Sequence, residues 1–283
     1  MSVKGSKKKI VLLDGAMGTT LQRSVPKTKG FPEIINLTNP ELVTKIQRAY
    51  VEAGSKIIYT NTFGANGKKA EKEGFRVDQV VAAAVENARA ACDKDTRVAL
   101  DIASVGEMME PYGTLSADRA YELFAETVRA GRGADLAVLE TMYDINELLA
   151  AIKAVRENSD LPIFATMTFT ASGRTITGCT PGEMAEKLEA AGVEAIGINC
   201  SLGPEESYPI MKELSSLSRL PLIIKPNAGK PDPKTGEYAM TPEEFAQRML
   251  PFAQLGVSYM GGCCGTGPEY IRALRKALDG MNA

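Results

Sequence analysis

Short apolar runs recur along the chain at fairly even spacing, and longer segments with helical periodicity separate them. The runs are nearly continuous in apolar residues rather than alternating, which is typical of parallel strands buried on both faces. There are eight such runs, at residues 10–13, 56–60, 98–102, 136–139, 163–166, 195–198, 222–224 and 257–260. The pattern therefore predicts eight buried parallel strands.

Helix start signals lie between these runs. Three of them place a capping residue before a proline at the first helical position, at Asn39-Pro40-Glu41, Thr180-Pro181-Gly182-Glu183 and Thr241-Pro242-Glu243-Glu244. Further helices are expected to begin near Asp78, Ser116, Asp144, Pro204 and Pro268. In the helix after Thr241, Pro251 predicts a kink or an early end.

Eight strands that alternate with eight helices predict an α/β fold, a (β/α)8 TIM barrel. We expect one domain over residues 10–283, with a doubly wound open sheet as the alternative. Connections after the strands are long, at 14–38, 61–77, 103–115 and 225–240, whereas those before the strands are short. Such elaborate loops belong to the C-terminal face of a barrel, where its active sites lie.

Polar residues follow most of the predicted strands and are expected to face one pocket on that face. They are Asp14, Asn61, Asp101, Glu140, Thr168, Asn199, Cys200, Asn227, Cys263 and Cys264.

Composition narrows the classes of function. The formal net charge is −2, and the one basic run, within residues 1–9, is predicted to be a solvated N-terminal tail, so no nucleic-acid partner is expected. No segment approaches the roughly 20 apolar residues that span a bilayer, and the start has no apolar signal core. The sequence thus predicts a cytoplasmic protein without a membrane partner.

The chain contains five cysteines and no histidine. An odd number of cysteines in a chain of this size suits a reducing compartment with metal-binding or catalytic thiols better than a disulfide framework. Histidine is the commonest general base near neutral pH. Any catalyst here must therefore act through thiolates, carboxylates or a metal that lowers the pKa of a substrate.

Two adjacent thiols lie in Gly261-Gly262-Cys263-Cys264-Gly265, directly after the eighth run, and Cys200 follows the sixth. Flanking glycines allow both sulfurs of the pair to converge on one point. Three thiolates leave one position of a tetrahedral zinc open, as in a catalytic site. Two buried cysteines in a tight turn, or a vicinal disulfide, are the alternatives. In a barrel, strands six and eight flank strand seven, so Cys200 and the Cys263–Cys264 pair can share one metal ion. This proximity favours zinc over the alternatives.

Five segments together resemble the homocysteine S-methyltransferase family, and most closely the homocysteine-binding module of cobalamin-dependent methionine synthase. They are Asp14-Gly15-Ala16-Met17-Gly18-Thr19, Thr60-Asn61-Thr62-Phe63-Gly64-Ala65, residues 197–204, Pro226-Asn227-Ala228-Gly229 and residues 261–266. The resemblance implies a (β/α)8 barrel in which Cys200, Cys263 and Cys264 hold a Zn²⁺ that binds the thiol of L-homocysteine.

The resemblance also implies roles for other residues. Asp14 and Glu140 match carboxylates that hold the amino group of homocysteine, and Asn199 and Asn227 complete the expected substrate-binding set. Asn227 is also a candidate for a fourth zinc ligand that substrate displaces. One departure is Asp101-Ile102-Ala103-Ser104, where family members often read Asp-Ile-Gly-Pro.

The resemblance implies a methyltransferase that forms methionine, with methylcobalamin on a corrinoid protein or module as the expected donor. The chain is then either a stand-alone subunit or a fragment of a multi-module synthase. A small donor such as S-methylmethionine or betaine is the alternative, although a betaine site needs an aromatic cage and the chain has no tryptophan. Alternatives of another class are a thiol redox protein that cycles a Cys263–Cys264 disulfide and a non-catalytic zinc-holding module.

Overall fold

The computed structural model describes residues 10–24 and 31–281, so the predicted tail at 1–9 lies outside the described residues. The described residues contain eight strands, each within or beside one of the predicted apolar runs. They are β1 (Val11–Leu12), β2 (Ile57–Tyr59), β3 (Arg97–Ala103), β4 (Leu136–Met142), β5 (Ile163–Met167), β6 (Ala195–Asn199), β7 (Leu222–Lys225) and β8 (Tyr259–Met260).

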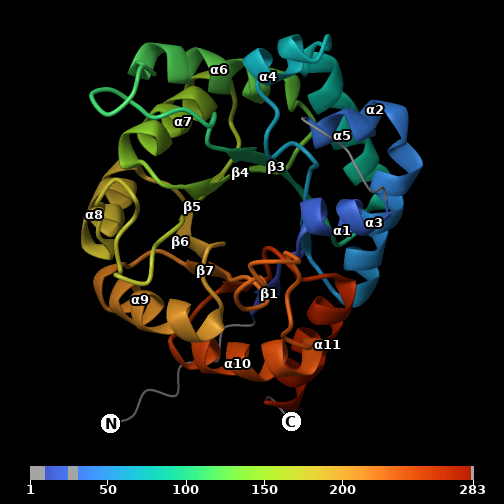
Figure 1. The fold of residues 1–283 in the computed structure, drawn as a ribbon, viewed down its shortest axis with the longest axis vertical. Coiled ribbons are helices and arrows are strands. Elements are labelled where there is room, and N and C mark those ends of the chain that lie inside the picture. The colour runs from blue at the N-terminus through green and yellow to red at the C-terminus, as the bar shows by residue number, and fades with distance from the viewer. Residues whose placement is uncertain (1–9, 25–30, 282–283) are drawn as a thin grey trace.

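All paired strands are parallel, and the order is β1-β8-β7-β6-β5-β4-β3-β2. A parallel bridge between Leu13 and Ile57 joins the two ends of this order, and the Lys56 N–H donates to the Leu12 carbonyl at 2.7 Å. Figure 1 shows the helices as an outer ring around the strands. The fold is the predicted (β/α)8 barrel, and the open-sheet alternative is wrong.

Eight helices form this ring, and each begins within a residue or two of its predicted start. They are α3 (Pro40–Ala53), α5 (Val77–Ala91), α6 (Ala117–Ala130), α7 (Ile145–Asn158), α8 (Pro181–Ala191), α9 (Pro204–Leu217), α10 (Pro242–Gln254) and α11 (Pro268–Gly280). Thr180 and Thr241 form the two predicted capping boxes. Helix α10 continues past Pro251 to Gln254, so it does not end at that proline.

Additional short helices lie inside the long loops after β1 and β2, where no helix was predicted. They are α1 (Met17–Ser24), η1 (Pro32–Ile34), α2 (Ile35–Thr38) and α4 (Gly67–Lys72). No helix in the described part of the chain is long and apolar enough to cross a membrane.

The barrel interior is filled in layers. An inward-facing apolar cluster includes Ile57, Ala99, Val138 and Ile223. Side chains two residues further along a strand face the same way. Above the apolar cluster the interior therefore becomes polar, through Asp101 on β3, Glu140 on β4 and Lys225 on β7, all of them buried. The fold places a charged layer directly below the loops of the C-terminal face.

Candidate active site at the mouth of the barrel

Three cysteine sulfurs converge at the mouth of the barrel, as predicted. The Sγ atoms of Cys200, Cys263 and Cys264 all lie within 4.8 Å of one another, and those of Cys200 and Cys264 are 3.8 Å apart. All three residues are partly buried. Such a cluster of soft donors suits a tetrahedral zinc.

Backbone hydrogen bonds to the last residue of β7 and to the segment after it hold the three thiols together. The Cys200 N–H donates to the Lys225 carbonyl at 3.0 Å, and the Cys263 N–H donates to the Pro226 carbonyl at 2.8 Å. The Ala228 N–H donates to the Cys264 carbonyl at 2.9 Å. Cys200 itself has φ 60, a left-handed conformation that is uncommon for a residue other than glycine. The thiols meet because β6 and β8 both pair with β7.

Two glycines permit this close approach. Gly265, next to Cys264, has φ +85, and a Cβ there would lie 2.4 Å from Cγ of Tyr238. Gly197 lies in β6, where a Cβ would stand 1.9 Å from the Ile223 carbonyl oxygen of β7. A side chain in place of Gly265 or Gly197 would therefore shift the backbone segment that carries a cysteine.

Hydrogen bonds among the thiols concentrate negative charge on Cys264. Its pKa falls to about 3 because the thiols of Cys200 and Cys263 and then the hydroxyl of Tyr238 stabilise the thiolate. For Cys200, the Cys263 thiol lowers the pKa, but the bond to Cys264 and burial outweigh that effect and raise the pKa to about 12. Hydrogen bonds from Cys200 and Cys264, together with burial, raise the pKa of Cys263 well above its usual range. The three thiols are therefore coupled, and Cys264 is the one whose thiolate form its neighbours stabilise.

Asn227 offers a further donor at this point. The residue is 4 % exposed, and its Oδ1 has no hydrogen-bond partner although it is buried. A buried amide oxygen without a partner is uncommon and needs an explanation. The three converging thiols fit the donor set of a zinc ion, and the residue after Asn227 is bonded to the backbone of Cys264. Cys92 and Cys179 are not part of this cluster.

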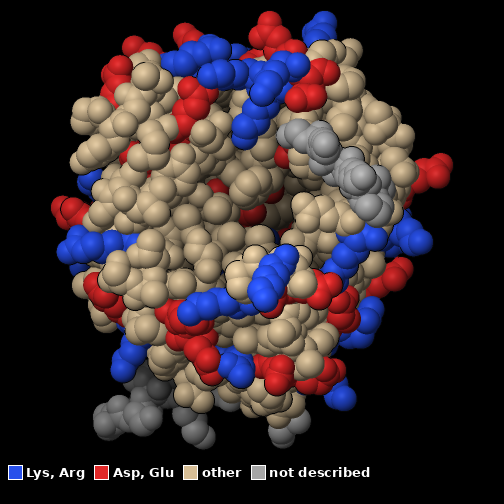
Figure 2. Space-filling model, viewed as in Figure 1, with Lys and Arg blue, Asp and Glu red and all other residues tan. Residues whose placement is uncertain are grey.

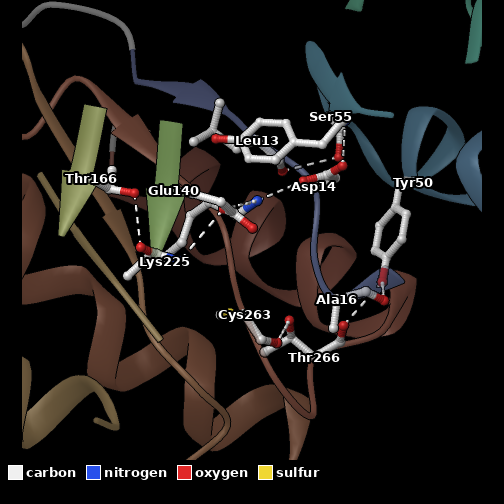
Figure 3. Close-up of polar contacts among 12 residues, drawn as sticks. Leu13, Asp14, Ala16, Tyr50, Ser55, Glu140, Thr166, Lys225, Cys263 and Thr266 are labelled. Atoms are coloured by element: carbon white, nitrogen blue, oxygen red, sulfur yellow. Dashed lines mark hydrogen bonds and ion pairs between the residues drawn. The ribbon is translucent and has the colours of Figure 1, made fainter. Parts of the chain in front are cut away.

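A second polar group lies below the cysteines. Asp14 Oδ1 forms an ion pair with Lys225 Nζ at 2.8 Å, and Asp14 Oδ2 accepts a hydrogen bond from the Tyr59 N–H at 2.7 Å. Lys225 Nζ also lies 3.8 Å from Glu140 Oε2 and 3.4 Å from the centre of the Tyr59 ring. Figure 3 shows Lys225 directed toward both carboxylates. Asp14 and Glu140 therefore lie together as predicted, but a lysine joins them.

Lys225 is not among the site residues predicted from the sequence, because it ends an apolar run and lies beside the Pro226-Asn227 motif. A signal was present, since Ile223 and Lys225 share one face of the strand and that face points inward. Burial of the lysine side chain requires a carboxylate partner, and Asp14 supplies it. Such a residue can be recognised as an internal counter-charge once the strand parity is known.

Asn199 uses its side chain within the protein. Its Oδ1 accepts hydrogen bonds from the Thr141 N–H and the Thr166 hydroxyl, both at 2.8 Å. Its Nδ2 donates to the Thr141 hydroxyl at 2.7 Å and to Glu140 Oε2 at 3.5 Å. Thr141 has a positive φ of 57. Asn199 thus holds the irregular end of β4 that carries Glu140.

The side chains of the other polar residues expected to face the pocket lie in different places. The Asn61 Nδ2 donates to Asn36 Oδ1 in α2, so this side chain faces the loop rather than the cysteines. Thr168 lies at the exposed rim with its hydroxyl 2.6 Å from that of Ser201. Asp101 is 5 % exposed, and its Oδ1 has no partner.

The mouth itself forms a hollow at the centre of the face in Figure 2, with acidic side chains visible in it. Two other cavities, of about 660 Å³ and 490 Å³, lie near α4–α6 and near α6 and α7. Neither contains a cysteine or any member of the buried charged group. The chemistry of the site is therefore concentrated in the central hollow.

The chain matches the family model described as homocysteine S-methyltransferase over residues 11–278. It is 31 % identical to the methionine synthases of Mycobacterium leprae and Mycobacterium tuberculosis, and the matches cover 97 % and 95 % of this chain. The chain spans about a quarter of the length of these relatives, 25 % in both cases.

Among solved structures, the chain is similar to the homocysteine methyltransferase MmuM from Escherichia coli. The oxidized and metallated forms give TM-scores of 0.82 and 0.81 at 24 % identity. The match to the oxidized form covers 94 % of this chain and 95 % of that chain. At this level of identity the likeness shows the barrel fold.

Proposed function

The chain belongs to the homocysteine S-methyltransferase family, and on that premise we propose that it transfers a methyl group to the thiol of L-homocysteine to give methionine, with a zinc ion held by Cys200, Cys263 and Cys264. Membership of this family supports a methyltransferase activity. The observation that supports the metal is the convergence of three sulfurs within 4.8 Å of one another.

Zinc, when bound, would supply a lowered pKa for the substrate thiol, so that the thiol acts as a thiolate nucleophile near neutral pH. This suits a chain without histidine to act as a general base. Asn227 would be the weak fourth donor that the substrate sulfur replaces. The cysteines and Asn227 are held by backbone bonds to neighbouring loops, which orient the nucleophile before reaction.

The amino acid end of the substrate would be bound by the charged layer below the cysteines. Glu140 Oε2 has only long contacts, 3.5 Å to Asn199 and 3.8 Å to Lys225, so this carboxylate retains capacity for an ammonium group. Asn199 contributes by fixing Glu140, and Asp14 contributes through Lys225. Residues 10–283 would form this homocysteine-binding domain.

We infer that the methyl donor is methylcobalamin on a corrinoid protein or module. The similarity to methionine synthases, of which the chain spans a quarter, supports this donor. S-methylmethionine is the small-donor alternative, since the family description names homocysteine but no methyl donor. Betaine is less well supported because the chain lacks tryptophan for an aromatic cage.

The two alternatives that are not methyltransferases, a thiol redox protein and a non-catalytic zinc-holding module, explain fewer features of the site. A redox pair of Cys263 and Cys264 gives no role to Cys200, whose sulfur lies 3.8 Å from that of Cys264. A zinc-holding module without catalysis gives no role to the buried charges beneath the cysteines.

The test is an assay of the zinc-loaded protein with homocysteine, offered methylcobalamin and then S-methylmethionine, with methionine formation as the readout. The same protein stripped of zinc by a chelator is the control. We expect methionine from methylcobalamin only in the zinc-loaded sample. If methionine forms only from S-methylmethionine, the donor is a small molecule. If no methionine forms from either donor, the proposed function is contradicted.

A further inference from the structure

A tyrosine that the proposed reaction does not use lies against the cysteine cluster. Tyr238 belongs to the loop between β7 and α10, and its side chain is partly buried. Its ring packs on Gly265, where a Cβ would lie 2.4 Å from Cγ of Tyr238 and 2.7 Å from its Cβ and Cδ2. The missing side chain of Gly265 therefore makes room for the ring directly beside Cys264.

The hydroxyl of Tyr238 reaches the thiols. It hydrogen-bonds to Cys264, and the thiols of Cys200 and Cys263 are also among its neighbours. A tyrosine hydroxyl keeps its hydrogen at neutral pH, whereas a thiolate can only accept. Tyr238 is therefore the donor and the Cys264 sulfur is the acceptor. A metal on all three sulfurs would displace the S–H hydrogens, and the tyrosine would then be the remaining side-chain donor to this sulfur in the described chain.

A hairpin at residues 231–238 presents Tyr238 to the cluster. Pro231 and Tyr238 form an antiparallel bridge, and the Asp232 N–H donates to the Glu237 carbonyl at 2.8 Å. Asp232 Oδ1 also accepts two backbone N–H groups inside the turn, at 2.8 Å and 2.9 Å. These bonds fix the backbone at Tyr238, and packing on Gly265 fixes the ring.

The hairpin is tied to the barrel on both sides. Before it, the Ala228 N–H donates to the Cys264 carbonyl at 2.9 Å. After it, the hydroxyl of Tyr270 in α11 donates to the Met240 carbonyl at 2.6 Å. The loop thus bonds to two tyrosine hydroxyls of different kinds, because that of Tyr270 anchors the loop and that of Tyr238 bonds to sulfur.

A hydrogen bond to a thiolate ligand changes a metal site through the sulfur. The bond favours the deprotonated form, which is the form that binds a metal. It also withdraws part of the negative charge that the sulfur would give to the metal. A zinc ion would then keep more of its positive charge for the ligand in the fourth position.

We propose that Tyr238 is a positioning residue of the metal site that acts through Cys264, its hydroxyl holding that sulfur as the thiolate which a metal binds. The inference rests on the metal in the proposed function and adds to it a residue outside the set of ligands. It also gives the hairpin at residues 231–238 a part in the chemistry of the site.

The experiment compares the wild type with Tyr238→Phe and Tyr270→Phe. Tyr238→Phe keeps the ring on Gly265 and removes only the hydroxyl. Tyr270→Phe is the matched control, because it removes the hydroxyl that anchors the same loop without touching a sulfur. Zinc affinity is measured at pH 7 by competition with a chromophoric chelator. The absorption spectrum of the protein loaded with Co²⁺ reports on the bonds between sulfur and metal.

In Tyr238→Phe, zinc should bind about ten- to a hundredfold more weakly, the usual effect of removing a hydrogen bond to a metal ligand. The sulfur-to-cobalt charge-transfer band should move to longer wavelength, because the sulfur holds its electrons less tightly without the donor. Tyr270→Phe should leave the affinity and the band unchanged, even if its thermal midpoint falls.

The inference requires both changes in Tyr238→Phe, and the absence of either one overturns it. Equal changes in Tyr270→Phe would assign the effect to the position of the loop and would overturn it as well. The proposed function survives these results, since the wild type still binds the metal. If the wild type binds neither Zn²⁺ nor Co²⁺, the metal of the proposed function and this inference both fail.

Discussion

Lys225 and Asp14 lie 211 positions apart in the chain, yet Nζ and Oδ1 are 2.8 Å apart and the two side chains are 4 % and 5 % exposed. The pair connects the carboxyl end of β7 to Asp14, two residues beyond the end of β1. Through the Tyr59 N–H it also reaches β2. It therefore joins strands on both sides of the point where the barrel closes.

Breaking this pair should destabilise the protein strongly. Lys225→Met removes the charge but keeps most of the side-chain length, and it leaves Asp14 as an uncompensated buried carboxylate. We expect a loss of about 3–5 kcal/mol in the free energy of unfolding, measured by denaturant titration. The double variant Lys225→Met, Asp14→Asn should recover most of that loss, because neither charge remains. A single variant within about 1 kcal/mol of the wild type would show that the pair does not support the fold.

Zinc binding should depend on Cys200. In Cys200→Ser a hydroxyl replaces a soft thiolate, so zinc should be lost or greatly weakened. Elemental analysis after dialysis gives zinc per chain, with about one expected in the wild type. Cys179→Ser is the matched control, since Cys179 is buried and lies outside the cluster. Full occupancy in Cys200→Ser would remove Cys200 from the metal site and contradict this prediction.

The stability of the protein should carry a pH dependence from Glu140. Burial, with Asp14 and Cys264 adding to it and Lys225 opposing it, raises its pKa from 4.5 to about 7. Asp101 faces the same carboxylate. Because the folded-state pKa is the higher one, the folded protein binds the proton more tightly. This contribution is complete below about pH 4.5 and is lost as the pH rises through 7.

The glutamine side chain in Glu140→Gln cannot ionise, so the variant lacks this contribution to the pH dependence of stability. The unfolding free energy of the variant minus that of the wild type should therefore rise between pH 5 and pH 8 by about 2–3 kcal/mol, at 1.36 kcal/mol per pKa unit. Denaturant titrations of both proteins in the same zinc state measure the difference. Parallel pH curves would mean that Glu140 is not held with a raised pKa.

The strands and the cysteine cluster could be predicted from the sequence because their signals are local. Buried parallel strands produce continuous apolar runs, and glycines frame each thiol segment. The barrel then determines that the ends of β6 and β8 meet across β7, and the cysteines did meet there. Capping boxes at Thr180 and Thr241 located helix starts for the same reason.

Features that depend on long-range pairing could not be predicted in this way. Asn61 follows a strand as Asp14 does, but the Thr62 N–H turns back to the Thr60 carbonyl and Asn61 pairs with Asn36 instead. The parity of its strand places Lys225 inside the barrel, but its partner Asp14 cannot be identified from that strand, because Asp14 lies 211 positions earlier in the chain. The short helices α1, α2 and α4 lack the length that gives a clear period.

The central claim is that the substrate thiol binds as a thiolate activated by zinc. A free thiol with a pKa near 8.5 is almost fully protonated at pH 7, so binding as thiolate must release its proton. Glu140 also titrates near this pH, and a comparison with methionine removes its contribution. Methionine carries the same amino acid end as homocysteine but has no ionisable thiol.

The measurement is calorimetry of homocysteine and of methionine binding to the zinc-loaded protein at pH 7, each in two buffers of different ionisation enthalpy. The dependence of the binding heat on the buffer gives the number of protons exchanged for each ligand. We predict that homocysteine releases about one proton per chain more than methionine. Equal proton counts for the two ligands, with zinc present and both bound, would contradict activation of the thiol by the metal.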